Sequence, residues 1–408
     1  MANNNENKIL NVPHLRFPEF SGEWEIYPLT DFMSFKNGMN PDAKRFGRGT
    51  KFISVMDILN NQFICYDNIR ASVEVVDGDI ETYGVNYGDI LFQRSSETLE
   101  DVGQANVYLD SKPAVFGGFV IRGKSKSNYY PMFFRYLLAS PTARKKIIVK
   151  GAGAQHFNIG QDGLSKVCLN IPSIQEQEKI AKLFECIDTR IATQNKIIED
   201  LKKLKCAIIE KVLNGNNANN LRLGDVGSYI RGLTYSSDDV VEYNSTLVMR
   251  SNNIVNGSLL DYQNNVVSVN KQISQEQQLQ DGDIIICMAN GSSALVGKSS
   301  FYDGKCISPI TVGAFCGIYR SKTAIAKWLF QTNRYRRYIW NSLQGGNGAI
   351  ANLNSEDILR MSFPLPDKQT AERCIKLLSS LESLIESNIS LCSKFSQQKE
   401  YLLRQMFI

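Results

Sequence analysis

The sequence contains little of what most metal centres and enzyme sites are built from. Among 408 residues there are only two histidines, His14 and His156, and the nine cysteines form no CxxC pair. Zinc sites and disulfide frameworks need such clusters, and reduced thiols of a cytoplasmic protein fit the pattern better. No apolar run approaches the ~20 residues that cross a bilayer, and the polar stretch 1–10 is unlike a signal peptide. We therefore expect a cytoplasmic protein without a metal site.

Common catalytic motifs are also missing. The sequence contains no GxGxxG, GxxxxGK[ST], GxSxG or HExxH, and no (D/N)PP(Y/F) tetrapeptide of the amino-methyltransferases. Two Gly-rich stretches, 115–120 and 151–154, lack the strand-to-helix spacing of a nucleotide-binding turn. These absences favour a binding protein over an enzyme.

What the chain does contain is an internal repeat at a shift of 194 residues. Its clearest segments are Gly88-Asp89-Ile90 and Gly282-Asp283-Ile284. Matches in the same order extend through both copies: Leu29, Asp31, Ser34, Gly38, Val102, Gly103, Tyr108, Gly151, Asn158, Pro172 and Gln175 pair with Leu223, Asp225, Ser228, Gly232, Val296, Gly297, Tyr302, Gly345, Asn352, Pro366 and Gln369. Since chance similarity does not keep one register over such a length, the chain is interpreted as two copies of one module, joined head to tail.

Each copy is predicted to contain a mixed domain followed by one long helix. In the mixed domains, 1–172 and 216–366, short β-branched and aromatic runs between Gly and Asn turns indicate strands. The spacing also predicts helices over 131–149 and 324–340. The long helices are expected over 173–215 and 367–408. The predicted fold class is therefore mixed α/β, with two tandem pseudo-symmetric modules.

The apolar residues of both long helices follow the alternating three- and four-residue spacing of a coiled-coil seam. Polar residues interrupt the seam at equivalent places, Gln194 and Lys205 in the first helix and Asn388 and Lys399 in the second. Two apolar stripes in one chain can bury each other, so we expect an antiparallel pair that acts as a spacer between the mixed domains. The alternative is that each helix only packs on its own domain.

The net charge of +5 is small for a nucleic-acid binder, but the charge is unevenly distributed. Residues 111–161 contain nine Lys or Arg and no Asp or Glu, and residues 304–355 of the second copy contain seven and none. Both mixed domains therefore carry a basic segment. A duplicated module with a spacer and two basic segments can read two sites on a roughly two-fold symmetric partner, such as duplex DNA.

Several segments resemble the DNA-specificity (S) subunits of type I restriction-modification systems. The likeness rests on PHLRFPEFSGEWEIYPLTDF (13–32), the two GDI segments, IPSIQEQEKIA (171–181) and the repeated order of variable domain and long helix. The segment LPDKQTAERCI (365–375) departs from the pattern, because Thr370-Ala371 replaces a Glu-Gln pair, but it keeps the helix. The resemblance covers essentially the whole chain.

This resemblance implies a subunit that makes no bond itself. Each mixed domain would be a target-recognition domain that reads one half of a bipartite double-stranded DNA sequence, and the helices would set the spacer. Two methylation subunits, which bind S-adenosylmethionine and methylate adenine, would dock on the chain. Two further restriction subunits would use ATP to cleave DNA. No cofactor and no catalytic residue are therefore expected on this chain.

Contacts with DNA are expected from Lys and Arg, which suit phosphate, and from Arg, Gln and Asn, which can read guanine or adenine. The candidates in the first module are Lys36, Lys44, Arg45, Arg48, Lys51, Arg94, Lys124, Lys126, Gln155 and His156. The candidates in the second are Arg231, Arg250, Lys298, Arg320, Lys322 and Asn347. The modules differ at most of these positions, so the target is expected to be asymmetric. For any one residue, a solvated surface charge is the alternative.

Two other classes of function stay open on the sequence alone. One is a stand-alone DNA-modifying enzyme with duplicated sites, which the missing cofactor and metal motifs disfavour. The other is a scaffold that binds protein. Binding to DNA releases counterions and weakens steeply with salt, which separates DNA recognition from a scaffold.

Overall fold

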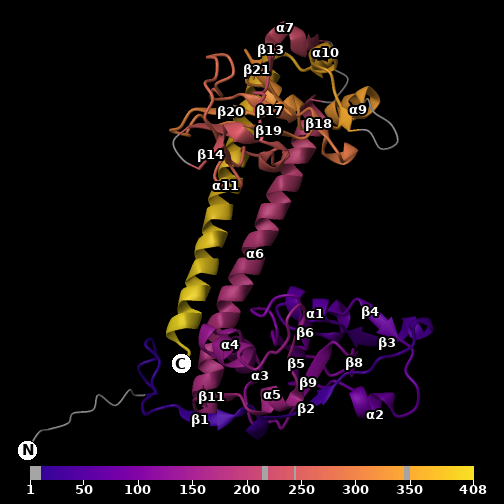
Figure 1. Ribbon diagram of the computed structural model, residues 1–408, viewed down its shortest axis with the longest axis vertical. Coiled ribbons are helices and arrows are strands. Elements are labelled where there is room, and N and C mark those ends of the chain that lie inside the picture. The colour runs from indigo at the N-terminus through magenta and orange to yellow at the C-terminus, as the bar shows by residue number, and fades with distance from the viewer. Residues whose placement is uncertain (1–10, 214–218, 243–244, 344–349) are drawn as a thin grey trace, which may run out of the picture. The chain divides into compact units, whose positions relative to one another are not determined.

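The computed structural model describes residues 11–213, 219–242, 245–343 and 350–408 of the chain (Figure 1). It divides into two compact units. The first contains Met1–Asn195 and Ser390–Ile408, and the second contains Lys196–Ile389. Each unit therefore holds one mixed domain and a part of both long helices, α6 (Ile174–Leu213) and α11 (Lys368–Gln405).

The first unit is built around two sheets and several short helices. Its strands are β1 (Glu25–Pro28), β2 (Met33–Asn37), β3 (Phe46–Ile53), β4 (Ala71–Val73), β5 (Ile90–Gln93), β6 (Ser95–Ser96), β7 (Ala105–Val107), β8 (Val115–Phe116), β9 (Val120–Ser125), β10 (Phe157–Asn158) and β11 (Cys168–Ile171). Its helices besides α6 and α11 are α1 (Val55–Asn60), α2 (Asp79–Tyr83), α3 (Pro131–Ala139), α4 (Pro141–Ile148) and α5 (Gln161–Ser165). The central sheet is antiparallel in the order β2-β9-β5-β7, and every side chain of β5 is buried.

The second unit repeats this plan. Its strands are β12 (Asn219–Arg222), β13 (Gly227–Arg231), β14 (Val240–Val241), β15 (Thr246–Met249), β16 (Val267–Val269), β17 (Ile284–Cys287), β18 (Ala289–Asn290), β19 (Ser299–Phe301), β20 (Ile310–Val312), β21 (Cys316–Ser321), β22 (Ala351–Asn352) and β23 (Ser362–Leu365). Its short helices are α7 (Leu223–Val226), α8 (Ala326–Leu329), α9 (Asn333–Ser342) and α10 (Ser355–Arg360). The central sheet is antiparallel in the order β13-β21-β17-β19.

The sheets confirm the internal repeat. Strands β2, β5 and β7 begin 194 residues before β13, β17 and β19, and the two central sheets have the same strand order. The second sheets also correspond, because β3 pairs with β8 in parallel as β15 does with β20. Two-stranded pairs β1-β11 and β6-β10 match β12-β23 and β18-β22. The predicted fold class, mixed α/β in two tandem modules, is confirmed.

Two of the predicted helices are wrong in extent, because each is broken by a cap in its middle. In the first module, Ser140 accepts a hydrogen bond from the Ala143 N–H (3.2 Å) and Pro141 opens the new helix, so 131–149 forms α3 and α4. In the second, Thr332 accepts from the Tyr335 N–H (3.1 Å), so 324–340 forms α8 and α9. Apolar spacing alone passes over both breaks.

The long helices pack against each other, and in each unit they run in opposite directions. In the first unit Asp188 of α6 contacts Lys399 of α11 at 2.5 Å, and Asn195 contacts Cys392 at 3.3 Å. Residue numbers therefore increase along α6 as they decrease along α11, which makes the two helices antiparallel. In the second unit Lys205 contacts Glu382 at 3.0 Å, and Ile209 and Leu213 share a core with Cys374 and Leu378. The predicted seam is confirmed, and its lysines are paired across it. No described helix is long and apolar enough to span a membrane.

Candidate nucleic-acid interface

The aspartates of the GDI segments close turns of the central sheets. Asp89 is buried and accepts hydrogen bonds from the backbone N–H groups of Asn86 (3.0 Å) and Ser125 (2.8 Å). Burial raises the pKa of Asp89, although both N–H groups oppose that shift. Asp283 accepts from the Gln280 N–H at 2.7 Å. Their geometry is that of turn residues, which is the role expected of a Gly-Asp before a buried strand.

Arg320, one of the predicted DNA contacts, is bound to its own domain. Its guanidinium makes two hydrogen bonds to Asp283, of 2.8 and 2.7 Å, and a third to the Gln278 carbonyl. The Asp283 side chain is 1% exposed, so loss of Arg320 would leave a buried carboxylate without its cation. Arg320 therefore has a structural role in addition to any contact with DNA.

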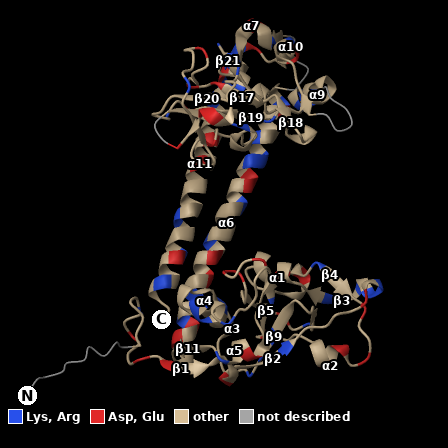
Figure 2. Ribbon diagram, viewed as in Figure 1, with Lys and Arg blue, Asp and Glu red and all other residues tan. Residues whose placement is uncertain are grey.

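Several Lys and Arg residues lie around β3 (Figure 2). Most of them are held by neighbouring groups. Arg45 pairs with Asp79 and donates to the Glu74 carbonyl, and Arg48 pairs with Glu74 at 2.7 Å. Lys51 donates to the Ile69 carbonyl at 2.7 Å. The Arg48 side chain is 71% exposed, so its ion pair is weak and can be exchanged for a phosphate. Lys44 is exposed, and Lys36 lies 5.4 Å from the Tyr83 ring centroid.

Strands β6 and β10 bring three of the first-module candidates to one edge. Arg94 directly follows β5 and donates to the Gly118 carbonyl at 3.2 Å, while its N–H bonds to the Phe119 carbonyl. Gln155 and His156 are exposed and lead into β10, which pairs with β6. Lys124 and Lys126 lie beyond, at the other end of β9 from Phe119, and Lys126 donates to the Thr30 carbonyl at 2.6 Å. The structure thus joins Arg94 with Gln155 and His156 but not with these lysines.

The second-module candidates are spread over several loops. Arg231 is exposed at the end of β13, and Lys322 is exposed beyond the end of β21. Arg250 donates to the Asn265 carbonyl at 3.2 Å. Lys298 lines a pocket beside α9, whereas Asn347 lies outside the described residues.

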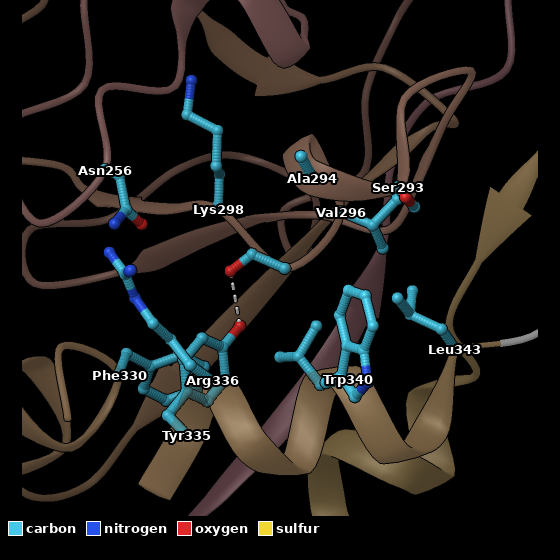
Figure 3. Close-up of a pocket in the computed structure, with 12 residues that line it drawn as sticks. Asn256, Ser293, Ala294, Val296, Lys298, Phe330, Tyr335, Arg336, Trp340 and Leu343 are labelled. Carbon is cyan, nitrogen blue, oxygen red and sulfur yellow. Dashed lines mark hydrogen bonds between the residues drawn. The ribbon is translucent and has the colours of Figure 1, made fainter. Parts of the chain in front are cut away.

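The pocket beside α9 has a volume of about 220 Å³ (Figure 3). Trp340 and Arg336 approach it from the helix, and Asn256 approaches from a loop that covers the sheet. Lys298 lines the pocket from a second loop, and its side chain extends away from α9 in Figure 3. In Figure 3 the Arg336 guanidinium reaches toward Asn256. The Tyr335 hydroxyl donates to the Gly297 carbonyl at 2.8 Å and fixes the helix against the loop. No Asp or Glu is among the residues that line it.

Comparison with family models gives the same description twice. The model for the "Type I restriction modification DNA specificity domain" matches residues 21–203 and again residues 216–391. The chain belongs to this family. S subunits of the family recognise the DNA target of a type I restriction-modification complex and are non-catalytic, so the resemblance and the predicted function are confirmed.

Individual relatives agree with the family assignment. The chain is 22% identical over 364 residues to the StySPI specificity subunit of Salmonella potsdam, covering 83% of this chain and 77% of that one. It is 29% identical over 171 residues to the EcoKI specificity subunit of Escherichia coli, covering 39% and 35%. The fold is similar to a crystal structure of a type I S subunit from M. genitalium, with a TM-score of 0.55 at 13% identity, covering 97% and 99%.

For an S subunit, sequence reasoning missed several exposed side chains. Phe119 and Phe315 occupy the equivalent turns before β9 and β21 and are 70% and 63% exposed. Arg336, Arg337 and Trp340 lie on the surface of α9. The repeated Gly-Gly-Phe and Gly-Ala-Phe turns and the cluster of three arginines in 334–337 were the signals available in the sequence. The predicted DNA contacts themselves stay predictions.

Proposed function

We propose that this S subunit reads a bipartite, asymmetric DNA target, one half through each mixed domain. In this proposal residues 1–172 and 216–366 are the target-recognition domains, and 173–215 and 367–408 form the spacer helices. The observation that carries it is the pair of central sheets, which have one strand order but present different side chains from their loops. A shared scaffold with different loops is what two different half-sites require.

The differences fall at the edges where DNA contacts are expected. Arg94 and His156 of the first module correspond to Met288 and Ile350 of the second. The second sheet has three strands, β4-β3-β8, in the first module and four, β14-β16-β15-β20, in the second. The side chains proposed to contact bases therefore differ between the two modules, and so does the number of strands in the second sheet.

The partners follow from the family. We propose that two methylation subunits, carrying S-adenosylmethionine, dock on this chain in the cytoplasm, and that restriction subunits using ATP join the complex where the host encodes them. The S subunit then contributes binding alone. Phosphate contacts position the duplex, and contacts with base edges select the sequence.

A gel-shift titration of the full chain against salt tests the DNA-binding part of the proposal. Counterion release predicts that affinity for a mixed-sequence 40-base-pair duplex falls steeply, along a straight line of log affinity against log salt. A flat response would instead favour the protein-binding scaffold. Methyl transfer by the purified chain alone would favour the stand-alone enzyme.

A further inference from the structure

Helices α4 and α9 occupy the same place in the two modules. Both begin at a hydroxyl cap, Ser140 and Thr332, that accepts a hydrogen bond three residues along. In both, an isoleucine packs on the glycine that precedes the edge strand of the central sheet, β7 or β19. A Cβ added to Gly103 would come within 2.6 Å of Ile147, and one added to Gly297 within 2.6 Å of Ile339. This register makes Arg336 the counterpart of Arg144, and Trp340 the counterpart of Ile148.

In the first module the arginine is used to hold the fold. Arg144 donates to the carbonyls of Glu100 (2.8 Å) and Val102 (2.6 Å). Burial lowers its pKa, and the nearby Asp101 opposes that shift. The loop it contacts, 97–104, contains three acidic residues. The Arg144 guanidinium at this corner of the first module is therefore bound to the fold and lies beside an acidic loop.

In the second module the same corner is open and cationic. The corresponding loop, 291–298, contains no acidic residue and has Lys298 in place of Gln104. Arg336 is exposed, and within the described part of the chain no hydrogen bond or ion pair is found for its side chain or that of Lys298. Between them lies the 220 Å³ pocket, and Arg337 lines an adjoining groove with Trp340 (Figure 3).

Trp340 makes this surface unusual. Its side chain is 72% exposed, whereas the other two tryptophans, Trp24 and Trp328, are 2% and 1% exposed. An exposed indole beside guanidinium groups, without a carboxylate, suits a ligand that has both a negative charge and a flat or apolar face. A nucleotide unit has both, because arginine binds its phosphate and an aromatic ring covers its sugar or base.

We propose that this pocket, the α9 pocket, binds a phosphodiester of the DNA held by the S subunit, with the Trp340 indole against the adjoining nucleoside. Arg336 holds this phosphate, and Lys298 and Arg337 extend the contact to neighbouring phosphates of the strand. The inference rests on the proposed function and adds an asymmetry to it. The contact does not depend on sequence. In the first module Lys145 corresponds to Arg337, but the counterparts of Arg336 and Trp340 are the bound Arg144 and Ile148, so the second module contributes more of the salt-sensitive affinity.

The three tryptophans allow a direct test with the full chain. Because only Trp340 is exposed, acrylamide quenching of tryptophan fluorescence reports on that residue. We expect a mixed-sequence 40-base-pair duplex to protect it from the quencher. Trp340→Phe should abolish the accessible fluorescence and with it the effect of DNA.

The salt dependence of DNA binding tests the cations. Replacing both Arg336 and Lys298 with Ala should lower the slope of log affinity against log salt by about 2, since each phosphate contact adds about 1. Arg336→Lys alone, with Lys298 unchanged, keeps both charges and should keep the wild-type slope. Arg360→Ala removes another exposed cation of the same unit, which pairs with Glu356, and serves as the matched control with no change in slope.

The outcomes separate the two proposals. If the wild type binds DNA with a steep salt slope but Trp340 is not protected and the Ala variant keeps the slope, the α9 pocket is not a DNA site and the proposed function stands. Protection of Trp340 by purified methylation subunits and not by DNA also overturns it. If the wild type shows no salt-dependent DNA binding, the proposed function itself fails.

Discussion

The two modules share the strand order of their central sheets but not their surface loops. Strands β5 and β17 are both buried along their whole length, between partners of the same order. By contrast, Arg144 is bound to backbone carbonyls, while its counterpart Arg336 faces a pocket. A buried strand must keep its partners and its packing, whereas a loop can change its charges freely. The repeat has therefore kept one scaffold with two different surfaces.

The long helices show the same internal symmetry. In the first unit Lys399 of α11 pairs with Asp188 of α6, and in the second unit Lys205 of α6 pairs with Glu382 of α11. Each lysine also lies over an aromatic ring, Tyr136 at 5.5 Å or Trp328 at 5.4 Å. The two ion pairs exchange helices, and their residues occupy equivalent positions of the 194-residue repeat. They also explain why a polar residue interrupts an apolar seam.

The largest effect is expected from inserting one heptad into both long helices. Seven residues add about 10 Å of helix, or about three base pairs of B-DNA. If the helices act as the spacer, methylation of the original target should be lost and a target with a longer spacer and unchanged half-sites should appear. An unchanged spacer in the methylated sequence would refute this role. An insertion in α6 alone shifts the seam and should give an unfolded or inactive subunit.

Breaking the buried ion pair of the second unit should cost more stability than breaking that of the first. Glu382→Ala leaves both Lys205 and Lys327 without their carboxylate, at a side-chain exposure of 11% for Lys205, and should cost about 3–5 kcal/mol. Asp188→Ala leaves Lys399, whose side chain is 26% exposed, and should cost less. Urea unfolding of both variants measures the difference. A larger cost for Asp188→Ala would contradict the account.

The two GDI aspartates should respond differently to neutralisation. Asp283→Asn removes the partner of Arg320 and should cost about 1–3 kcal/mol. Asp89→Asn should cost less, because the Asp89 carboxyl accepts backbone hydrogen bonds and its pKa is already raised. Equal losses in thermal unfolding would mean that the Arg320 pair adds nothing.

The pH dependence of stability gives a further check on Asp89. Because burial raises its pKa, the folded state holds this proton more tightly than the unfolded chain. Its contribution to stability is present below the ordinary aspartate pKa and is lost as the pH rises through the raised value. The melting temperature of the wild type, relative to Asp89→Asn, should therefore fall over this window. A difference that stays constant with pH would show that the pKa is not raised.

The smallest effect is expected from His156, which is exposed and has Ile350 as its counterpart. His156→Ala should leave the free energy of unfolding unchanged within about 0.5 kcal/mol. Affinity for the target should fall by about 1 kcal/mol, roughly fivefold, with discrimination lost only in the first half-site. Ile350→Ala serves as the matched control. Loss of discrimination in the second half-site would show that His156 does not contribute to recognition of the first.

The sequence predicted the scaffold better than the site, for physical reasons. The repeat and the 3–4 spacing are properties of the chain order, so the two modules and the paired helices could be read from it directly. Tertiary partners could not. Arg320 is bound to Asp283, and Arg122, counted in the first basic segment, is 6% exposed and bonded to the Gly84 carbonyl. A count of charges in a segment does not show which of them reach the surface.

The α9 pocket illustrates the same limit from the other side. Positions 144 and 336 are equivalent and both are arginine, so only the surroundings of Arg144 and Arg336 distinguish them. The loop at 291–298 lacks the acidic residues of 97–104, a difference that is visible in the sequence. Its meaning depends on the contact of that loop with α9, which only the structure gives.

Methylome sequencing of a host with and without this chain would show directly whether the S subunit selects a bipartite DNA target. The chain should be required for adenine methylation at one bipartite target, whose two half-sites differ and are separated by a spacer of fixed length. Replacing residues 216–366 with the corresponding domain of another S subunit should change one half-site and leave the other intact. A palindromic target, a change in both half-sites, or a methylation pattern that does not depend on the chain would contradict the account.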